Sequence, residues 1–293
     1  MIQNAFLSVS KAFIIAFLLL AANQTMAQRN MKPKLPGSEY QNFLNTQWWL
    51  GIKAGMNYSQ PIPGQRYSTI DPINYDLELL EKEYDQFNKP GVMLGLDISL
   101  YHKGFSIGTQ PVFKSMGYSY NSSIEWTGDT ETQTFETAYE SEQTMSYIEL
   151  PLSVKYEFIQ SGKVRPYLMV GMQYSFLLDA NKKTKITHTD YQSGSPVSYS
   201  GGNVSINVKD GFQNYYGALG GIGAAFDYFN IRTVLEISYN YGMSSITNTK
   251  ARFSENELVS LGETNDEITI NNINASLSIV FPLRYIDKTF SPY

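Results

Sequence analysis

Residue types that perform chemistry are few in this chain and lie far apart. None of the 293 residues is a cysteine, which excludes a thiol nucleophile, a cysteine-ligated metal, a disulfide scaffold and a lipidated N-terminal cysteine. The two histidines, His102 and His188, fall in separate segments, so we do not expect them to share a metal ion. His188 and Asp190 are two residues apart in a predicted loop, which is weak support for an enzyme at the rim of the protein. The sequence therefore predicts no catalytic, cofactor-binding or metal-binding residue.

Charged residues of both signs recur on the polar side of segments that alternate with apolar residues. The set predicted to share one interior comprises Lys53, Asp97, Glu149, Lys155, Glu157, Asp227, Arg232, Glu236 and Arg284. A buried ion is costly unless it is paired, so we expect these acids and bases to neutralise one another inside a narrow, closed space. The alternative is that they line a path for small solutes.

A period of two dominates the segments that carry these charges. Leu235, Ile237 and Tyr239, for example, alternate with Glu236 and Ser238, as in a strand with one apolar and one polar face. The same pattern predicts eight strands, over 50–58, 92–101, 104–118, 148–158, 168–178, 217–228, 231–241 and 272–285. Pro111 cannot donate a ladder hydrogen bond, so we expect a bulge there.

Two architectures compete for these strands. A soluble sandwich buries the apolar face, whereas a membrane barrel turns that face to lipid and the polar face to its lumen. Loop lengths favour the barrel, because long connections (59–90, 120–145, 180–211 and 244–267) alternate with short ones (102–104, 159–163 and 229–230). The sequence therefore predicts an all-β, eight-stranded antiparallel transmembrane β-barrel with long extracellular loops and short periplasmic turns.

The long loops have distinct charges. Segment 120–145 carries six acidic residues and no basic one, and segment 180–211 is rich in lysine. Within 59–90, apolar residues at helical spacing predict a short amphipathic helix over the barrel mouth, with Leu77, Leu80, Tyr84 and Phe87 on one face. These charges are explained either by hydration of extracellular loops or by a surface that docks another protein.

The N-terminus predicts export. Lys11, an apolar run over 12–22 and small residues before position 28 are typical of a signal peptide over 1–27 that is cleaved before Gln28, with an uncleaved anchor as the alternative. A periplasmic arm (28–47), the barrel (48–286) and a short tail (287–293) follow. The net charge of −5 argues against a nucleic-acid partner.

Four strands carry motifs of a known family. Segment 147–156 (YIELPLSVKY) resembles a strand of the PorT-like outer-membrane barrel family of Bacteroidota, and segments 165–171 (RPYLMVG), 235–242 (LEISYNYG) and 49–58 (WLGIKAGMNY) are similar to three others. The resemblance implies a barrel in the outer membrane over about 48–286. Some members of that family are implicated in type IX secretion.

Two functions from different classes follow. The first is a non-enzymatic scaffold, or a subunit of an envelope assembly, with a link to type IX secretion implied by the resemblance. Its partners would be outer-membrane lipid and other proteins, and it needs no cofactor. The second is a narrow channel for small solutes, which is less favoured because side chains just fill an eight-stranded barrel.

Overall fold

The computed structural model describes residues 46–66, 82–128, 134–159, 163–192, 195–228, 231–251 and 264–283. The chain divides into two compact units, Met1–Leu44 and Asn45–Tyr293, and all of the described residues belong to the second. The predicted signal peptide, almost all of the predicted arm, the tail and Arg284 lie outside the described residues. No helix within the described ranges is long and apolar enough to cross a membrane.

The described part of the chain is built of antiparallel strands with two short 3-10 helices. The strands are β1 (Thr46–Pro63), β2 (Glu83–Tyr84), β3 (Pro90–His102), β4 (Phe105–Thr109), β5 (Val112–Thr127), β6 (Thr134–Glu157), β7 (Val164–Asp190), β8 (Val197–Asn207), β9 (Tyr215–Tyr228), β10 (Ile231–Gly242) and β11 (Ile268–Pro282). The helices are η3 (Lys209–Gly211) and η4 (Thr249–Ala251).

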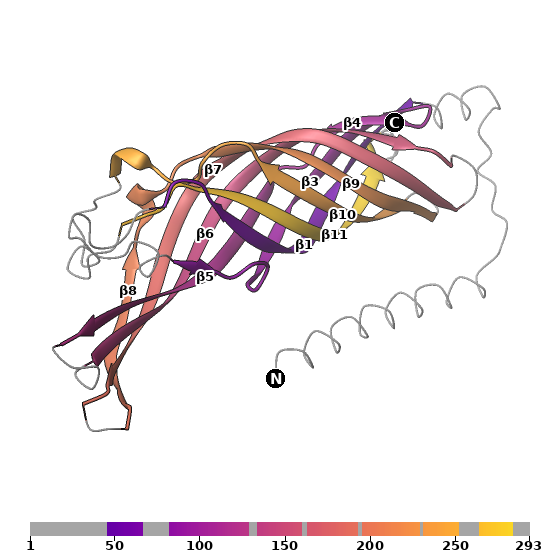
Figure 1. Ribbon diagram of the computed structural model, residues 1–293. Helices are drawn as coiled ribbons and strands as arrows, with labels where there is room; N and C mark the ends of the chain where they lie inside the picture. The colour runs from indigo at the N-terminus through magenta and orange to yellow at the C-terminus, as the bar shows by residue number, and fades with distance from the viewer. Residues whose placement is uncertain are drawn as a thin grey trace, which may run out of the picture. The chain divides into compact units, whose positions relative to one another are not determined.

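The strands form a closed ring of eight members (Figure 1), in which β4 and β5 together count as one member. In order around the ring, the members are β1, β3, β4 together with β5, β6, β7, β9, β10 and β11. β11 then pairs with β1 along its whole length, with Lys53 opposite Ser278, which closes the sheet. Because the ring is closed, none of its strands has an unpaired edge within the ring. The prediction of an eight-stranded antiparallel barrel is confirmed.

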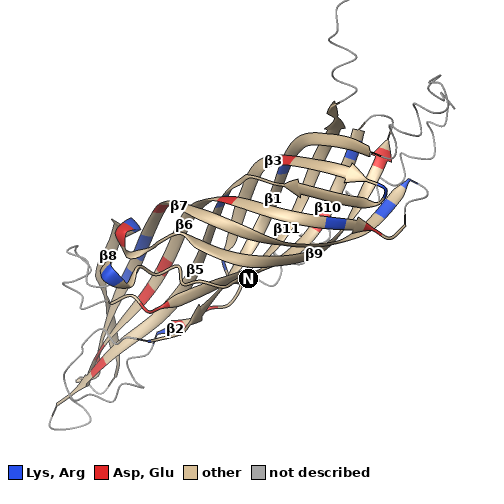
Figure 2. Ribbon diagram, turned by 90° about the horizontal axis from the view of Figure 1, so that it is seen from above, with Lys and Arg blue, Asp and Glu red and all other residues tan. Residues whose placement is uncertain are grey.

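The two faces of the wall have opposite chemistry. Leu96, Val154 and Leu277 point outward and are 42–46% exposed, whereas Lys53 and Glu149 point inward and are at most 6% exposed. A soluble protein would bury the first group and expose the second, so this inverted arrangement is the one expected in lipid. Figure 2 shows acidic and basic residues on the barrel strands as well as near their ends.

The bulge predicted at Pro111 is wrong. Ile98 faces Thr109 and Gly95 faces Val112, so the register with β3 is the same on both sides of the proline. Pro111 only interrupts the hydrogen-bond ladder, because it has no N–H, and its carbonyl still accepts from Leu96 N at 2.9 Å.

A bulge does occur in β7, at Leu178. Ser146 faces Asp179, but the next residue of β6, Tyr147, faces Leu177, so Leu178 is an extra residue. Because the side-chain period of a strand is two, one extra residue exchanges its faces. Before the bulge Gln173 points into the lumen, and after it Lys182 is buried on the same side.

Three ring strands, β5, β6 and β7, continue past the ring and form with β8 a sheet that we call the extension, over 119–127, 134–145, 179–190 and 197–207 (Figure 1). Most of segments 120–145 and 180–211 is therefore strand, and their prediction as loops is wrong. Both faces of these strands carry serine, threonine and charged residues, so no apolar alternation signals them. Tyr84, predicted in a helix, lies in β2, while Leu77 and Leu80 are outside the described residues.

Candidate functional site

The lumen is the candidate site, and at its turn end it is crossed by an arginine cluster. The Arg232 guanidinium donates to both carboxylate oxygens of Asp227, from Nε at 2.6 Å and Nη2 at 2.9 Å, and to Glu157 Oε1 at 2.9 Å. Arg165 adds a second cation, with its Nε 3.2 Å from Asp227 Oδ2. The Arg232 guanidinium also lies 4.6 Å from the ring centre of Trp49. The planar fork of arginine suits this arrangement of two carboxylates and a stacked ring.

The next layer along the axis is centred on Glu236. Its two carboxylate oxygens accept from Lys53 Nζ at 2.7 Å and from Lys155 Nζ at 2.8 Å, and Tyr167 OH donates to the second oxygen at 2.8 Å. A Cβ at Gly223 would lie 2.3 Å from the Tyr167 ring, so the glycine makes room for this phenol. β1, β6, β7 and β10 thus meet at one carboxylate.

Gln110 ties Asp97 to the Glu236 layer. Its Oε1 accepts from Lys53 Nζ at 2.8 Å, and its Nε2 donates to Asp97 Oδ2 at 2.7 Å. The residue before Pro111 therefore bridges an acid and a base from two other strands, and both of its amide functions are used.

A third ion pair lies nearer the extension. Lys114, whose side chain is fully buried, is 3.1 Å from Glu149 Oε1, which also accepts from Tyr215 OH at 2.9 Å. Beyond it the lumen is filled by large side chains that we call the aromatic plug. It comprises Met116, Tyr118, Tyr120, Met145, Tyr147, Phe212, Tyr215, Ile246, Ile268 and Ile270, each at most 6% exposed.

Between the Glu236 layer and the plug, one side of the lumen is lined by amides. We call this set the amide girdle, and it comprises Asn57, Gln173, Asn240, Asn272 and Asn274. Asn240 Nδ2 donates to Gln173 Oε1 at 2.5 Å, and Ser59 Oγ donates to Asn272 Oδ1 at 2.7 Å. Four buried atoms of the girdle have no protein partner: Asn57 Oδ1, Gln173 Nε2, Asn272 Nδ2 and Asn274 Oδ1. Buried polar groups are normally hydrogen-bonded, so these two donors and two acceptors suit internal water.

The structure describes eight of the nine charged residues predicted in the lumen, all but Arg284. Each of the eight contacts at least one polar side chain from a different strand or a neighbouring turn. The prediction missed Lys114, Gln110 and Arg165. Lys114 shares the inward parity of Val112 and Met116, but assuming a bulge at Pro111 concealed it.

Comparison with known proteins agrees with this architecture. The family described as "Outer membrane protein beta-barrel domain" matches residues 26–248. The chain belongs to this family. The protein is accordingly an outer-membrane β-barrel, and its lumen and surfaces are those of a membrane protein. A search of curated proteins gives no match.

Several solved outer-membrane barrels are similar to this barrel protein. Neisserial surface protein A is 11% identical, with 78% of this chain and 96% of that chain covered and a TM-score of 0.33. Ail, the attachment invasion locus protein of Yersinia pestis, is 11% identical, with 80% and 99% covered and a TM-score of 0.29. Outer membrane protein AlkL is 12% identical, with 87% and 96% covered and a TM-score of 0.36.

The histidines of this outer-membrane barrel lie in different regions. His102 ends β3 and its Nδ1 is 2.7 Å from Thr46 Oγ1, while His188 lies in the extension with its Nδ1 2.9 Å from Thr137 Oγ1. Within the described ranges, no group of three or more histidine, aspartate or glutamate side chains could hold a metal ion.

The charges of the extension are partly matched to one another. Acidic residues of β6 face lysines of β7, and Lys185 Nζ lies 3.1 Å from Glu140 Oε2. Glu142 instead pairs with Lys89, at 2.5 Å. These pairs are largely exposed and contribute little to stability. Large apolar side chains are also exposed there, with Trp126 at 63% and Tyr199 at 51%.

Proposed function

We propose that this protein is a non-enzymatic, closed outer-membrane barrel that acts as a scaffold or as a subunit of an envelope assembly. The observation that carries the proposal is the filled lumen. The Arg232 cluster, the Glu236 layer, the Lys114–Glu149 pair and the aromatic plug succeed one another along the axis. Such a barrel anchors a structure in the membrane, and its work is done on its surfaces.

The surface best suited to that work is the tip of the extension. Trp126 at the end of β5, with Val197 and Tyr199 on β8, are each more than half exposed. Exposed aromatic residues are frequent anchors of protein interfaces. We call these three residues the docking patch and propose that it binds a protein partner outside the cell. The short turns and both termini would then lie in the periplasm, after removal of the predicted signal peptide.

Affinity purification from native membranes tests this function. A tagged wild-type barrel should retain a stoichiometric partner, and the double variant Trp126→Ala, Tyr199→Ala should lose it. The matched control is Ile231→Ala, which removes an exposed apolar side chain at the opposite end of the barrel and should retain the partner. Equal recovery with all three proteins would contradict a role for the docking patch.

The finer assignment to the PorT-like family is supported by the four strand motifs alone, and with it the link to type IX secretion. Deleting the gene in its host and assaying export of type IX cargo tests that link. Normal cargo export would separate this barrel from the secretion system.

The second candidate function is a narrow channel. It is favoured by the amide girdle, because four unpartnered amide atoms imply water inside part of the lumen. The plug and the ion pairs on either side of the girdle argue against a continuous path, and conductance recording separates the two functions.

A further inference from the structure

A groove opens in the rim of the barrel where one strand, β3, does not reach as far as its neighbours. β3 begins only at Pro90, whereas β1 continues to Pro63 and β5 to Thr127. β1 and β5 therefore run on without the strand that separates them lower in the barrel. The two-residue strand β2 bridges part of this gap, with Glu83 opposite Asn121 on β5. On the other side, Phe87 N donates to Ser59 O of β1 at 3.0 Å.

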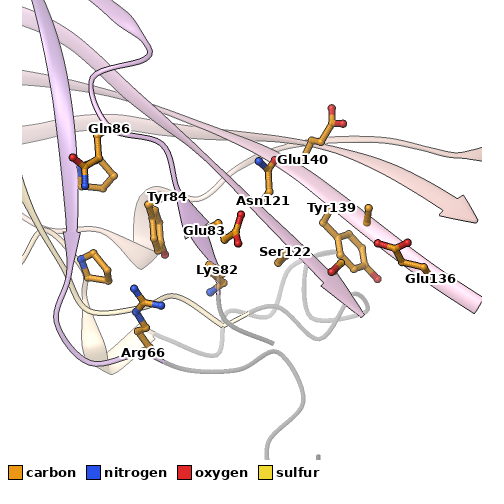
Figure 3. A pocket seen from close by; sticks show the side chains of 14 residues that line it. Arg66, Lys82, Glu83, Tyr84, Gln86, Asn121, Ser122, Glu136, Tyr139 and Glu140 are labelled. Atoms are coloured by element: carbon orange, nitrogen blue, oxygen red, sulfur yellow. The ribbon is translucent and has the colours of Figure 1, made fainter. Parts of the chain in front are cut away.

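The groove that remains has a volume of about 760 Å³ (Figure 3). This size is within the range of small-ligand sites. Arg66, Lys82 and Tyr84 lie on one side, and Tyr139 and Glu136 on the other (Figure 3). None of its lining residues belongs to the docking patch, so this inference is independent of the proposed protein partner.

The two walls of the groove offer different contacts. Pro61 and Pro63 present rigid, apolar rings and no N–H, which prevents a peptide from adding to that edge of β1 by regular strand pairing. The opposite wall is formed by β5 and β6, where Ser122 and Tyr139 are directly paired and present a hydroxyl and a ring on one face, while Asn121 lies on the other face. A ligand that fits both walls has apolar C–H faces and many hydroxyl groups.

The charged residues of the groove further restrict the kind of ligand that it can bind. Of its three carboxylates, Glu140 is paired with Lys185 at 3.1 Å, which leaves Glu83 and Glu136 against the cations Arg66 and Lys82. The Lys82 ammonium is directed away, to the carbonyl of Thr264 and to Asp266 at 3.4 Å. An anionic ligand such as a phosphate would be repelled, whereas a neutral or cationic one would not.

We propose that the rim groove binds a saccharide that is neutral or carries amino groups. Sugar hydroxyls would exchange hydrogen bonds with Ser122, and a sugar C–H face would pack on Tyr139, which lies beside it on the same face. An amino group would be favoured by the carboxylates. The saccharide can come from a glycolipid headgroup in the same leaflet or from a free glycan, and both present the same chemistry.

Binding is tested with the full-length barrel in nanodiscs, using a panel of free neutral, amino-bearing and acidic oligosaccharides. Neutral or amino-bearing members should bind with saturation, and acidic ones should not. Tyr139→Ala and Ser122→Ala should each weaken binding about tenfold or more, while Tyr139→Phe should retain most of it. Tyr241→Ala, which removes an exposed tyrosine outside both the groove and the docking patch, is the matched control and should bind as the wild type does.

A second arm places a neutral glycolipid in the nanodisc. Saturation by the glycolipid alone would support the proposal with the membrane as the source, and equal saturation by the free glycan would support a soluble source. The proposal is overturned if neither form saturates the protein, if Tyr139→Ala binds as tightly as Tyr241→Ala, or if a peptide library rather than a glycan occupies the groove. Retained heat-modifiable migration of each variant shows that its barrel is folded. Loss of the protein partner in the docking-patch variant would leave this result unaffected.

Discussion

At the scale of single residues, the lumen is held by a few charged groups with several partners each. Glu236 accepts hydrogen bonds from three side chains and Arg232 donates to two carboxylates. Both residues are at most 5% exposed, so removing one member leaves others buried and uncompensated. Such a loss is expensive, because the remaining charge keeps its desolvation cost.

Arg232→Ala should therefore destabilise the barrel by about 3–5 kcal/mol, as breaking a buried pair typically does. Arg232→Lys should recover part of this loss, because it restores the charge but not the two-pronged contact with Asp227. Unfolding by denaturant in lipid vesicles measures both. Lys185→Ala, at an exposed ion pair of the extension, is the control and should cost less than about 1 kcal/mol. A similar small change for Arg232→Ala would show that the cluster is not desolvated.

The amide girdle should hold ordered water. Nuclear magnetic resonance of the barrel should show magnetisation transfer from long-lived water to the side-chain amide protons of Gln173 and Asn272. The Gln110 amide serves as the control and should show weaker transfer, because one of its two Nε2 hydrogens already donates to Asp97. Absence of transfer at Gln173 and Asn272 would mean that the girdle is dry.

Pairing at this scale could be predicted only in part. The inward parity of Lys53, Lys155 and Glu236 follows from alternation along their own strands. Their meeting depends on the stagger between β1, β6 and β10, which no single strand encodes. The inward position of the girdle amides follows from the same alternation, whereas their unpartnered atoms depend on the same stagger between strands.

At the scale of elements, the alternation of apolar and polar residues identifies the strands that form the barrel wall. An outward residue in mid-strand contacts lipid, so the sequence alone identified the lipid-facing row from apolar residues at every second position. The extension could not be identified in this way, because both of its faces meet water or polar groups and the apolar contrast disappears. Its threonines and serines favour strands when neighbouring strands are present, a condition that only the fold supplies.

Val154→Arg tests the lipid-facing row. Placing a guanidinium near the middle of the bilayer should cost about 2–4 kcal/mol. Ser205→Arg, on exposed β8, should leave the free energy of unfolding nearly unchanged, since that strand is proposed to lie in water. Equal and negligible effects at both positions, measured by unfolding in lipid, would contradict a membrane-spanning β6.

Orientation is tested by labelling. Ser198→Cys in the otherwise cysteine-free chain should react with a membrane-impermeant maleimide on intact cells, because β8 is proposed to be extracellular. Lys103→Cys, in the short turn between β3 and β4, should react only after the outer membrane is permeabilised. The reverse pattern would invert the proposed topology.

At the scale of the whole barrel, the parts are proposed to have different roles: the ring with its filled lumen anchors the protein, and the extension binds other molecules. The ring resists opening because ion pairs join strands that are distant in the sequence, such as Lys53 with Glu236. The extension and the rim groove are proposed to lie outside the cell and to bind other molecules there. A channel would need the aromatic plug to move, and the plug packs side chains from β5, β6, β9 and β11 together.

Single-channel recording in planar bilayers tests the closed lumen most directly. The wild-type barrel, inserted at verified density, should give no resolved conductance steps, and Arg232→Ala should lose stability without gaining a large conductance. Discrete steps from the wild type, with an ion selectivity that changes in Arg232→Ala while stability does not, would show a hydrated, conducting lumen and contradict the scaffold function.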